Sequence, residues 1–470
     1  MNLPQYAMFA PSQRVHFIGI GGIGMSGIAE ILLTMGYPVS GSDLRTSPTT
    51  ERLEKLGAQI YIGHAAEHAA ATDVVVTSSA VAKDNPEVLE ARSRKTPVIP
   101  RAEMLAELMR LKYGIAVAGM HGKTTTTSMI AAVLAGGELD PTVVVGGRVD
   151  AMGSNARLGR SQYLVAEADE SDRSFLRLSP IMAVVTNLDR EHMDAYRDMT
   201  DIEDAFVQFM DEVPFYGAVT ACADNPALKA ILPRVTPRVY TYGESPDADF
   251  RLRMLRAEPG CDPACHAAFE VNTRGLVLGP FHLHVPGRHN ILNATAAVAI
   301  GVQLGIDPEK IAAGLRSFRG VDRRFQTKGQ AGGVTVIDDY GHHPTEIRAT
   351  LQAARECGYG RVLVLFQPHR YTRTRDLMDE FAGAFGDADA VQVLDIYAAS
   401  EAPIEGISGE TLAAAVRTQG GGRVTYAPSM SEAVERLAAD ARDGDMILTL
   451  GAGSVSQAGP LLLERLRASL

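Results

Sequence analysis

The stretch YGIAVAGMHGKTTTTSMIAAVL, Tyr113–Leu134, decides how the rest of the chain is interpreted. Its first residues form a short apolar run typical of a buried strand, and the run after Lys123 has the apolar spacing of a helix. Gly119 and Gly122 lie between the two. Glycines allow backbone N–H groups to converge on an anion at a helix N-terminus. We therefore predict a phosphate-binding loop.

Two side chains of this loop carry the predicted chemistry. Lys123 is expected to reach the outer phosphates of a nucleoside triphosphate, and Thr124 to offer its hydroxyl to Mg²⁺. The usual spacing G-x-x-x-x-G-K-[ST] needs glycine at position 117, where the chain has Val117, so a shorter G-x-x-G-K-T-T is present. The alternative is a plain tight turn between a strand and a helix.

Size and composition restrict the class of protein. A chain of 470 residues is expected to form about three domains. The formal net charge of -11 does not favour nucleic acid or an anionic membrane as a partner. Four scattered cysteines predict reduced thiols rather than a disulfide framework. With neither a signal peptide nor a bilayer-length apolar run, the sequence predicts a soluble, cytoplasmic protein.

The residues from Arg14 read RVHFIGIGGIGMSGIAEILLTMGYPVSGSD, a strand, a glycine turn, a helix and a second strand. Gly19, Gly21 and Gly24 match G-x-G-x-x-G, and Asp43 ends the next strand, where a dinucleotide fold keeps its ribose-binding acid. The match predicts a pyrophosphate on a helix N-terminus. A nicotinamide-dependent oxidoreductase is therefore one alternative for the whole protein.

Further strands are expected at 59–63, 73–79 and 97–100, which makes residues 1–107 a small doubly wound domain. Ser78 and Ser79 end one of these strands, at the edge where such sheets bind ligands. They are candidates for ligand contact, although serines at strand ends also act simply as turn formers.

A second domain is predicted from 108 to 320 around the phosphate loop. Strands at 162–168 and 181–188 end in EADESD and DREHMD. Parallel strands would place Lys123, Glu167 and His192 in one cleft, with oxygen ligands suited to Mg²⁺. Other acidic residues of the two loops are rival ligands: Glu170, Asp172, Asp189, Glu191 and Asp194.

Two features follow within this domain. Residues 236–285 alternate with glycine and proline breaks, which predicts an antiparallel excursion. The stretch VPGRHNILNATAAVAIGVQLG then predicts a helix on which Asn290 and Asn293 project from nearly one side. Asparagine amides can pair with an adenine edge. The alternative is that Asn290 is only the N-cap.

A third alternating segment begins after FRGVDRRFQT, with strands expected at 334–340, 361–367, 390–396, 423–427 and 445–450. Its first strand ends in DDYGHHPTE and its second in FQPHRYTRTRD. Carboxylates and imidazoles on one strand end, with arginines on the next, predict a polar crevice at the sheet edge.

Taken together, the motifs GMHGKTTTT, EADESD, TNLDREHMD, GRHNILNA, DRRFQ and DDYGHHPTE, in this order, resemble the bacterial cell-wall Mur ligases. IGIGGIGMSG and FQPHRYTRTRD make the alanine-adding branch of that family the best match. The resemblance extends from about residue 14 to about residue 460.

The resemblance implies an α/β protein of three domains, each built around a largely parallel sheet. Residues 1–107 would form a Rossmann-like domain that binds a UDP-sugar, and residues 108–320 a P-loop domain that binds ATP. Residues 321–470 would form a second Rossmann-like domain that closes the site and binds the amino acid. The implied reaction joins L-alanine to the lactyl carboxylate of UDP-N-acetylmuramate, with ATP and Mg²⁺, in peptidoglycan synthesis. The protein would be a monomer or a homodimer.

The resemblance also implies roles for single residues. Lys123, Glu167 and His192 would be catalytic, and Thr124, Glu167 and His192 would bind Mg²⁺. The remaining implied roles are the following: for ATP, Gly119, Met120, His121, Gly122, Lys123, Thr124, Thr125, Asn290, Asn293, Arg324 and Asp339; for the UDP-sugar, Gly21, Gly22, Gly24, Ser78 and Ser79; and for the amino acid or the substrate carboxylate, His343, Arg370 and Arg373.

One departure from the wider family concerns a second metal. Several relatives hold it with a carbamylated lysine some fifteen residues beyond the histidine, and residues 193–212 contain no lysine. The alanine-adding branch is not expected to have that lysine. The sequence leaves two further alternatives open, which are a sibling ligase of wall recycling that adds a whole peptide and a P-loop NTPase of another class.

Overall fold

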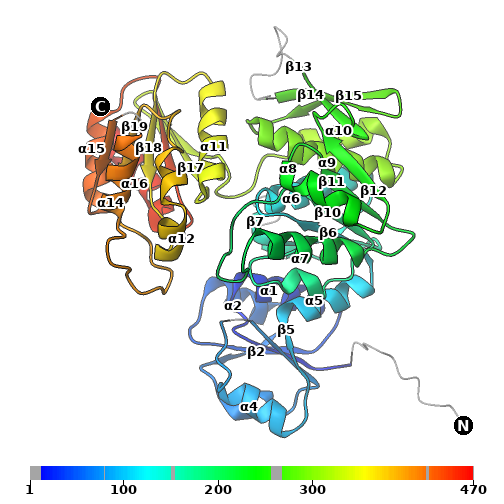
Figure 1. Ribbon diagram of the computed structural model, residues 1–470. Coiled ribbons are helices and arrows are strands. Elements are labelled where there is room, and N and C mark those ends of the chain that lie inside the picture. Colours follow the sequence, from blue (N-terminus) through cyan, green and yellow to red (C-terminus); the bar gives the residue numbers. More distant parts are fainter. Residues whose placement is uncertain (1–11, 79, 150–153, 256–266, 420–422, 469–470) are drawn as a thin grey trace, which may run out of the picture. The chain divides into compact units, whose positions relative to one another are not determined.

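The computed structural model describes residues 12–78, 80–149, 154–255, 267–419 and 423–468 (Figure 1). The chain divides into two compact units. The first contains residues 1–253, 270–280 and 292–318, and the second contains residues 254–269, 281–291 and 319–470. The described residues form three β-sheets of five, ten and six strands, so the predicted α/β class is confirmed.

The first sheet is entirely parallel, in the order β3-β2-β1-β4-β5. The strand order reverses between β1 and β4, and in open α/β sheets ligands bind at such a switch point, outside the carboxyl ends of the strands. Gly19 follows β1 and Ser78 follows β4, so both lie at this edge. The elements are β1 Val15–Ile18, α1 Ile23–Thr34, β2 Val39–Asp43, α2 Pro48–Lys55, β3 Gln59–Ile62, α3 Ala66–Ala69, β4 Val74–Thr77, α4 Pro86–Ser93, β5 Val98–Pro100 and α5 Arg101–Arg110.

The ten-stranded sheet has the order β15-β14-β13-β12-β11-β10-β6-β9-β7-β8. Strand β6 pairs in parallel with β9 on one side and β10 on the other, which confirms the predicted neighbours of the phosphate loop. The strands are β6 Tyr113–Ala118, β7 Thr142–Val149, β8 Ser154–Arg157, β9 Tyr163–Glu167, β10 Met182–Val185, β11 Ala218–Cys222, β12 Val239–Gly243, β13 Phe250–Leu255, β14 Ala267–Thr273 and β15 Leu276–Leu283.

The helices that follow these strands supply the remaining elements of this part of the chain. Strand β6 leads directly into α6, and α9 carries the two predicted asparagines. The elements are α6 Lys123–Gly136, η2 Ser174–Arg177, α7 Met199–Asp211, α8 Pro226–Ile231, η3 Leu232–Arg234, α9 Arg288–Gln303 and α10 Pro308–Ser317.

The prediction of an antiparallel excursion over 236–285 is wrong for its first part. Strand β12 pairs in parallel with β11, and β13 pairs in parallel with the end of β12 through Tyr242–Phe250 and Gly243–Arg251. Parallel neighbours normally need a long crossover. Here β13 is staggered along the sheet and begins beside the last residues of β12, so the short connection between them is long enough.

The third sheet has the order β16-β17-β21-β18-β19-β20. All the strands predicted after residue 334 are present and parallel, whereas β16 is an antiparallel edge strand that the sequence analysis missed. The elements are β16 Gln326–Ala331, β17 Val334–Asp339, α11 Pro344–Glu356, β18 Val362–Phe366, α12 Tyr371–Asp376, α13 Met378–Ala382, β19 Ala390–Val393, α14 Gly409–Thr418, β20 Arg423–Tyr426, α15 Met430–Asp440, β21 Met446–Leu450, η4 Ser454–Gln457 and α16 Ala458–Ala468.

The third sheet has a separate apolar core on each of its two faces. One core contains Val364 and Phe366 of β18 together with Leu351 of α11. The other contains Leu365 of β18 and Leu462 of α16. Helices on both faces account for the nearly unbroken apolar run of β18, because a strand in a parallel sheet is buried on both sides.

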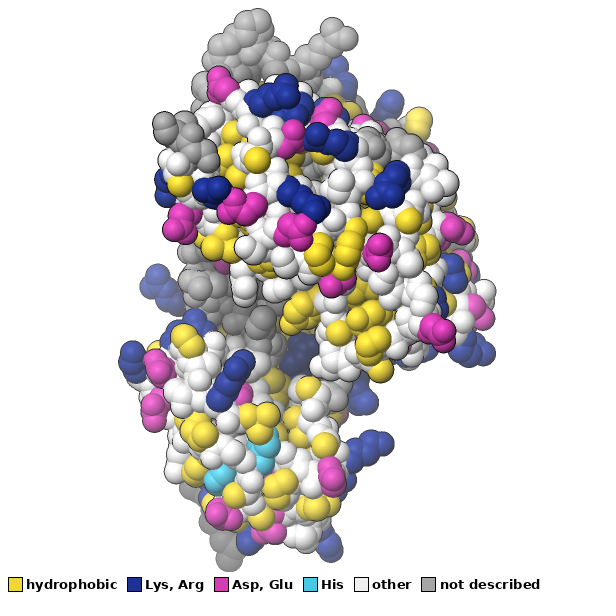
Figure 2. Space-filling model, turned by 90° about the vertical axis from the view of Figure 1, so that its left-hand side faces the viewer, with side chains coloured by type: hydrophobic (Ala, Val, Ile, Leu, Met, Phe, Trp, Pro, Cys, Tyr) yellow, Lys and Arg dark blue, Asp and Glu magenta, His cyan; other side chains and the backbone are white. Residues whose placement is uncertain are grey.

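Three further findings bear on the predictions. Among the helices that the structure describes, none combines the length and apolar character needed to cross a membrane. On the face shown in Figure 2, basic and acidic side chains are interspersed. The strands of the three sheets lie within 15–100, 113–283 and 326–450, while the domain boundaries at 107/108 and 320/321 remain predictions.

Candidate functional site

The loop after β6 requires both of its glycines. Gly119 has φ +131° and Gly122 has φ +82°, and both values lie in the left-handed region that favours glycine. A Cβ on Gly119 would lie 2.1 Å from Oγ1 of Thr186, and one on Gly122 would lie 2.8 Å from Oδ1 of Asn293. The loop is therefore held closely between the end of β10 and helix α9.

Asn187, the second residue after β10, fixes the backbone of the loop. Its Oδ1 accepts from the N–H of His121 at 2.9 Å, and its Nδ2 donates to the carbonyl of His121 at 2.9 Å. Its own carbonyl accepts from the N–H of Met120 at 3.3 Å. Asn187 is not among the residues predicted from the sequence, although an amide just beyond the strand that adjoins β6 is an available signal.

Lys123 is mostly enclosed, with 15% of its side chain exposed, and makes three hydrogen bonds. Its Nζ donates to the carbonyls of Gly119 at 2.8 Å and Met120 at 3.3 Å, and to Oε1 of Glu170 at 2.7 Å. Burial alone would lower the pKa of Lys123, but the charges of Glu170 and Glu167 outweigh it and raise the pKa to about 12. The amine is therefore a cation at neutral pH, as phosphate binding requires.

Glu170, one of the rival acids, is the direct partner of Lys123. Its carboxylate is buried, and its Oε2 has no hydrogen-bond partner among the described residues. A buried carboxylate oxygen without a partner is costly in a purely structural role. Glu170 therefore belongs to the site, and spacing alone could not distinguish it from the neighbouring acids.

Thr124 and Glu167 lie together at the start of α6 and the end of β9. The hydroxyl of Thr124 donates to Oε2 of Glu167 at 2.9 Å, and the N–H of Gly146 donates to the same oxygen at 2.7 Å. A hydroxyl beside a carboxylate is a donor set that suits Mg²⁺, which prefers oxygen ligands. The residues present therefore fit the predicted metal.

His192 has a different neighbour. Its Nε2 lies 3.3 Å from Oε1 of Glu170, and its backbone is left-handed, with φ +57°. A non-glycine residue in this conformation marks a constrained loop position. The structure thus brings Lys123, Glu170 and His192 together, and it joins Thr124 to Glu167.

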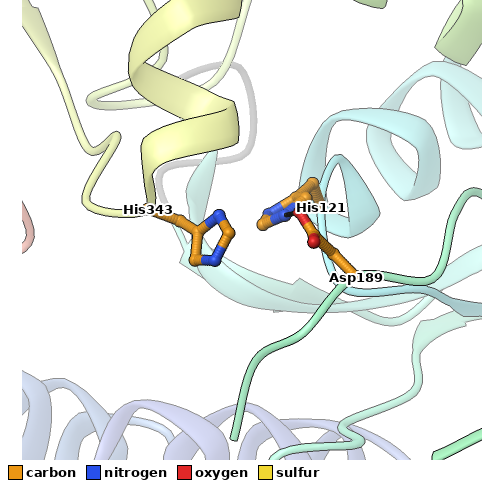
Figure 3. Close-up of side chains that lie close together, drawn as sticks. All are labelled: His121, Asp189 and His343. Atoms are coloured by element: carbon orange, nitrogen blue, oxygen red, sulfur yellow. Dashed lines mark hydrogen bonds and ion pairs between the residues drawn. The ribbon is translucent and has the colours of Figure 1, made fainter. Parts of the chain in front are cut away.

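His121 points toward the loop that follows β10. Its Nε2 lies 2.9 Å from Oδ2 of Asp189 (Figure 3). Its Nδ1 lies 3.9 Å from the carboxylate of Glu191. Asp189 and Glu191, which were predicted as rival Mg²⁺ ligands, therefore lie beside the imidazole of His121 in the phosphate loop. This arrangement orients the imidazole and places negative charge beside it.

The two asparagines lie in the first turns of α9, which begins at Arg288. Asn290 and Asn293 are each 7% exposed, and Nδ2 of Asn290 donates to the carbonyl of Pro286 at 2.6 Å. Asn290 is inside the helix, so the N-cap alternative is wrong. The side chain of Asn293 lies against Gly122 of the phosphate loop. Thr125, another predicted contact of ATP, is buried in α6.

The glycine turn after β1 is held by Asp43. Its Oδ2 accepts from the N–H of Gly21 at 2.9 Å. Gly22 is the N-cap residue of α1, and a Cβ on Gly24 would meet the side chain of Arg101 at 2.9 Å. Of the two predicted serines, Ser78 follows β4 and Ser79 lies outside the described residues.

In the second unit, Asp339 is buried at the end of β17. Its Oδ2 accepts from the N–H of Phe325 and its Oδ1 from the N–H of Gly341, both at 2.7 Å. Burial raises the pKa of Asp339, against the lowering effects of Arg324 and of these two bonds. Arg324 itself lies over the ring of Tyr340, with 5.2 Å between its Cζ and the ring centroid.

The side chains proposed to contact the amino acid lie beyond β17 and β18. Arg370 has φ +70°, and Nη1 of Arg373 donates to Nδ1 of His369 at 3.1 Å. Burial, followed by nearby His342 and Arg373, lowers the pKa of His369 to about 3, so its ring is neutral. His369 is not among the residues predicted from the sequence.

His343 has a structural task as well as its predicted role. It is the N-cap residue of α11, and its Nδ1 accepts from the N–H of Thr345 at 3.3 Å. An imidazole is an unusual residue to cap a helix, because serine, threonine, aspartate and asparagine are preferred. The DDYGHHPTE motif therefore builds the start of a helix as well as a polar edge.

Comparison with protein families gives three consecutive matches. Residues 14–113 match the model described as "Mur ligase family, catalytic domain", residues 117–301 match "Mur ligase middle domain", and residues 323–453 match "Mur ligase, glutamate ligase domain". The three matched segments follow one another in the order of the three sheets.

Individual relatives match over nearly the whole chain. A protein of Acidobacterium capsulatum named UDP-N-acetylmuramate--L-alanine ligase is 68% identical over 463 residues, which cover 98% of this chain and 100% of the relative. A protein of the same name from Solibacter usitatus is 57% identical and covers 98% of this chain and 97% of its own.

Two solved structures are similar to this chain over nearly its full length. The UDP-N-acetylmuramate-alanine ligase of Thermotoga maritima has a TM-score of 0.77 at 30% identity, covering 97% of this chain and 100% of its own. A murein peptide ligase of Psychrobacter arcticus has a TM-score of 0.66 at 23% identity, covering 97% and 99%. The second likeness concerns the fold alone.

Proposed function

The chain belongs to the Mur ligase family, and we propose that it catalyses the ATP-dependent joining of L-alanine to the lactyl carboxylate of UDP-N-acetylmuramate. The 68% identity to a whole-length relative of that name supports this choice of substrates. The observation that carries the chemistry is Lys123, a mostly enclosed lysine that two carbonyls of a glycine loop and Glu170 hold as a cation. The product would be a precursor of peptidoglycan.

The reaction would proceed in two steps. The lactyl carboxylate attacks the γ-phosphate of ATP, which gives an acyl phosphate and ADP. The amine of L-alanine then attacks the acyl carbon, and inorganic phosphate leaves. No nucleophile from the protein is needed, because both bond-forming groups belong to the substrates. Catalysis then consists of placement and charge neutralisation. Placement alone can contribute effective molarities of about 10⁵ to 10⁸ M.

The roles of the loop follow from its contacts. The transferring phosphoryl group spreads negative charge over its oxygens, and a fixed cation stabilises that charge. Lys123 supplies the cation, and Gly119 and Gly122 give the backbone its inward turn. Glu170 holds the amine of Lys123 in place before the nucleotide binds, and His192 lies beside the same oxygen of Glu170.

Thr124 and Glu167 would hold Mg²⁺, with His192 as the third proposed ligand. When bound, the ion would neutralise charge on the terminal phosphates. Thr124→Val removes the hydroxyl at nearly constant volume, so we expect the Mg²⁺ concentration for half-maximal activity to rise by about tenfold. Ser128→Ala removes a neighbouring hydroxyl, which donates to the carbonyl of Thr124, and serves as the matched control.

The remaining assignments rest on family resemblance and on position. Asn290 and Asn293 would adjoin the adenine. The other proposed contacts are Met120, His121 and Thr125 with the triphosphate, Arg324 with the phosphates, Asp339 with the ribose, Gly21, Gly22, Gly24, Ser78 and Ser79 with the UDP portion, and His343, Arg370 and Arg373 with the amino acid or the substrate carboxylate. Because ATP and the UDP-sugar are nucleotides, we place the protein in the cytoplasm, as a monomer or a homodimer.

The test is phosphate release from ATP with UDP-N-acetylmuramate and one amine at a time. L-Alanine, glycine, L-serine and a wall tripeptide that begins with L-alanine form the series. Release that needs both the sugar nucleotide and L-alanine supports the proposal. Preference for the tripeptide would make the protein the peptide-adding sibling, and release without any amine would indicate an NTPase of another class.

A further inference from the structure

Arg323, the residue before the proposed phosphate ligand Arg324, joins three separate segments of the second unit. Its Nε donates to Oδ2 of Asp338 at 3.1 Å, and its Nη2 donates to the carbonyl of Gly451 at 2.5 Å. Weaker contacts at 3.5 Å reach the carbonyls of Ala452 and Gly453. One guanidinium thus connects its own turn to β17 and to the loop after β21.

The partners of Arg323 are fixed in turn. Asp338 is fully buried, and the hydroxyl of Thr449 on β21 donates to its other oxygen at 2.7 Å. The carbonyl of Arg323 accepts from the N–H of Tyr340 at 2.6 Å. Charge-assisted hydrogen bonds of this kind are stronger than neutral ones, so the position of Arg323 is well determined.

These contacts set the place of Arg324. The ring of Tyr340 has Arg323 over it at 5.0 Å and Arg324 over it at 5.2 Å, measured from each Cζ to the ring centroid. On the other side of Arg324, the N–H of Phe325 donates to Asp339 at 2.7 Å. The backbone is therefore held both before and after Arg324.

The backbone on both sides of Arg324 has an unusual conformation. Arg323 has φ +59° and Phe325 has φ +49°, so two non-glycine residues that flank Arg324 are left-handed. Such conformations are strained for residues other than glycine and persist only where the surroundings impose them. The bonds of Arg323 and Phe325 supply that constraint.

We propose that Arg323 is a positioning residue that fixes Arg324 and the ring of Tyr340 for phosphoryl transfer. This inference rests on the proposed function, in which Arg324 reaches the phosphates. Arginine suits the task because its planar fork can donate to a carboxylate and to several carbonyls at once. A lysine would keep the charge but not this set of directions.

The experiment is a double-mutant cycle with Arg323→Lys, Arg324→Ala and the double variant. We expect R323K to lower kcat for L-alanine-dependent phosphate release by about tenfold, with the KM for UDP-N-acetylmuramate changed by less than about twofold. Because Arg323 acts through Arg324, adding R323K to the R324A variant should lower kcat further by less than about twofold.

Arg361→Lys is the matched control. Arg361 also joins a carboxylate to a backbone carbonyl, since its Nε donates to Asp445 at 3.1 Å and its Nη2 to the carbonyl of Asp440 at 2.7 Å. It does so beside the amino end of β18, at the edge of the sheet opposite Arg323. We expect both R361K and R323K to lower the melting temperature. Only R323K should also lower kcat, and R361K should leave kcat unchanged.

The outcomes separate this inference from the proposed function. If the two losses multiply in the double variant, Arg323 does not act through Arg324 and the inference fails, even though the wild-type enzyme is active. If wild-type protein shows no L-alanine-dependent release, the proposed function itself fails. Should R323K not fold, Asp338→Asn replaces it in the same cycle, because it weakens the bond from Nε while keeping both arginines.

Discussion

Two glutamates of the first unit, Glu87 and Glu170, are both buried beside basic side chains, but their oxygens are used differently. Glu87 lies in α4 beneath the first sheet. One of its oxygens accepts from Ser42 at 2.7 Å and lies 3.5 Å from Nε2 of His16, while the other lies 2.9 Å from Nδ1 of His68. Both oxygens therefore have partners.

Among the described residues, only one oxygen of Glu170 has a partner. Its Oε1 serves Lys123 and adjoins His192, while Oε2 has no partner among the residues that the structure describes. The comparison teaches that burial and charge do not by themselves identify a functional acid. A fully paired cluster holds a fold together, whereas a partly paired one beside a glycine loop is prepared for a ligand.

The strongest way to break this comparison is Lys123→Ala. We expect kcat for ATP-dependent phosphate release to fall by at least about 10³-fold, because the cation that stabilises the transferring phosphate is lost. Binding of UDP-N-acetylmuramate, measured by calorimetry, should change by less than about threefold, since the sugar nucleotide is assigned to the first sheet. Equal loss of both would contradict that division.

Glu87→Gln tests the structural member of the pair. Removing one partner from a buried charged cluster should lower the free energy of unfolding by about 3 kcal/mol, measured by urea denaturation. The kcat of the remaining folded enzyme should be close to that of the wild type. Glu67→Gln, at an exposed position of α3, is the control and should change stability by less than about 0.5 kcal/mol.

Low pH should also destabilise the protein through the carboxylate of Glu87. Burial alone would raise the pKa of Glu87, but the hydrogen bonds from His16, Ser42 and His68 outweigh it and lower the pKa from 4.5 to about 2. A depressed pKa contributes stability that is present above 4.5 and is lost as the pH falls toward 2. The lowering of the pKa from 4.5 to about 2 corresponds to about 3 kcal/mol in the free energy of unfolding.

The measurement for this prediction is urea unfolding at a series of pH values between 5 and about 2. We expect the stability of the wild type to fall across that range by more than that of E87Q, which lacks the titrating group. Parallel curves for the two proteins would show that Glu87 is not the group responsible.

The smallest expected effect comes from His68→Phe. The ring of His68 stacks on Tyr61, with 4.1 Å between centroids and 8° between planes, and a phenyl ring can keep that contact. Only the bond to Glu87 is lost, which should cost about 1.5 to 2 kcal/mol. A loss as large as that of E87Q would mean that His68 alone maintains the cluster.

The sequence predicted most of the fold because strands buried on both faces leave unbroken apolar runs. Strand β18, VLVLF, is completely buried and was readily predicted. Strand β16, QTKGQA, was missed because an edge strand carries polar residues and lacks that pattern. Parallel pairing of β12 with β13 was also missed, because alternation along a strand does not record the direction of its neighbour.

At the candidate site, the sequence by itself determined the glycine loop, Lys123 and Thr124, because these residues are adjacent and their spacing carries the chemistry. Only the tertiary structure decided that Lys123 pairs with Glu170, that Asn187 holds the loop, and that Arg323 reaches the turn after β21. Those partners lie tens of residues apart, so their meeting depends on strand order and register. Local patterns of residues do not specify either one.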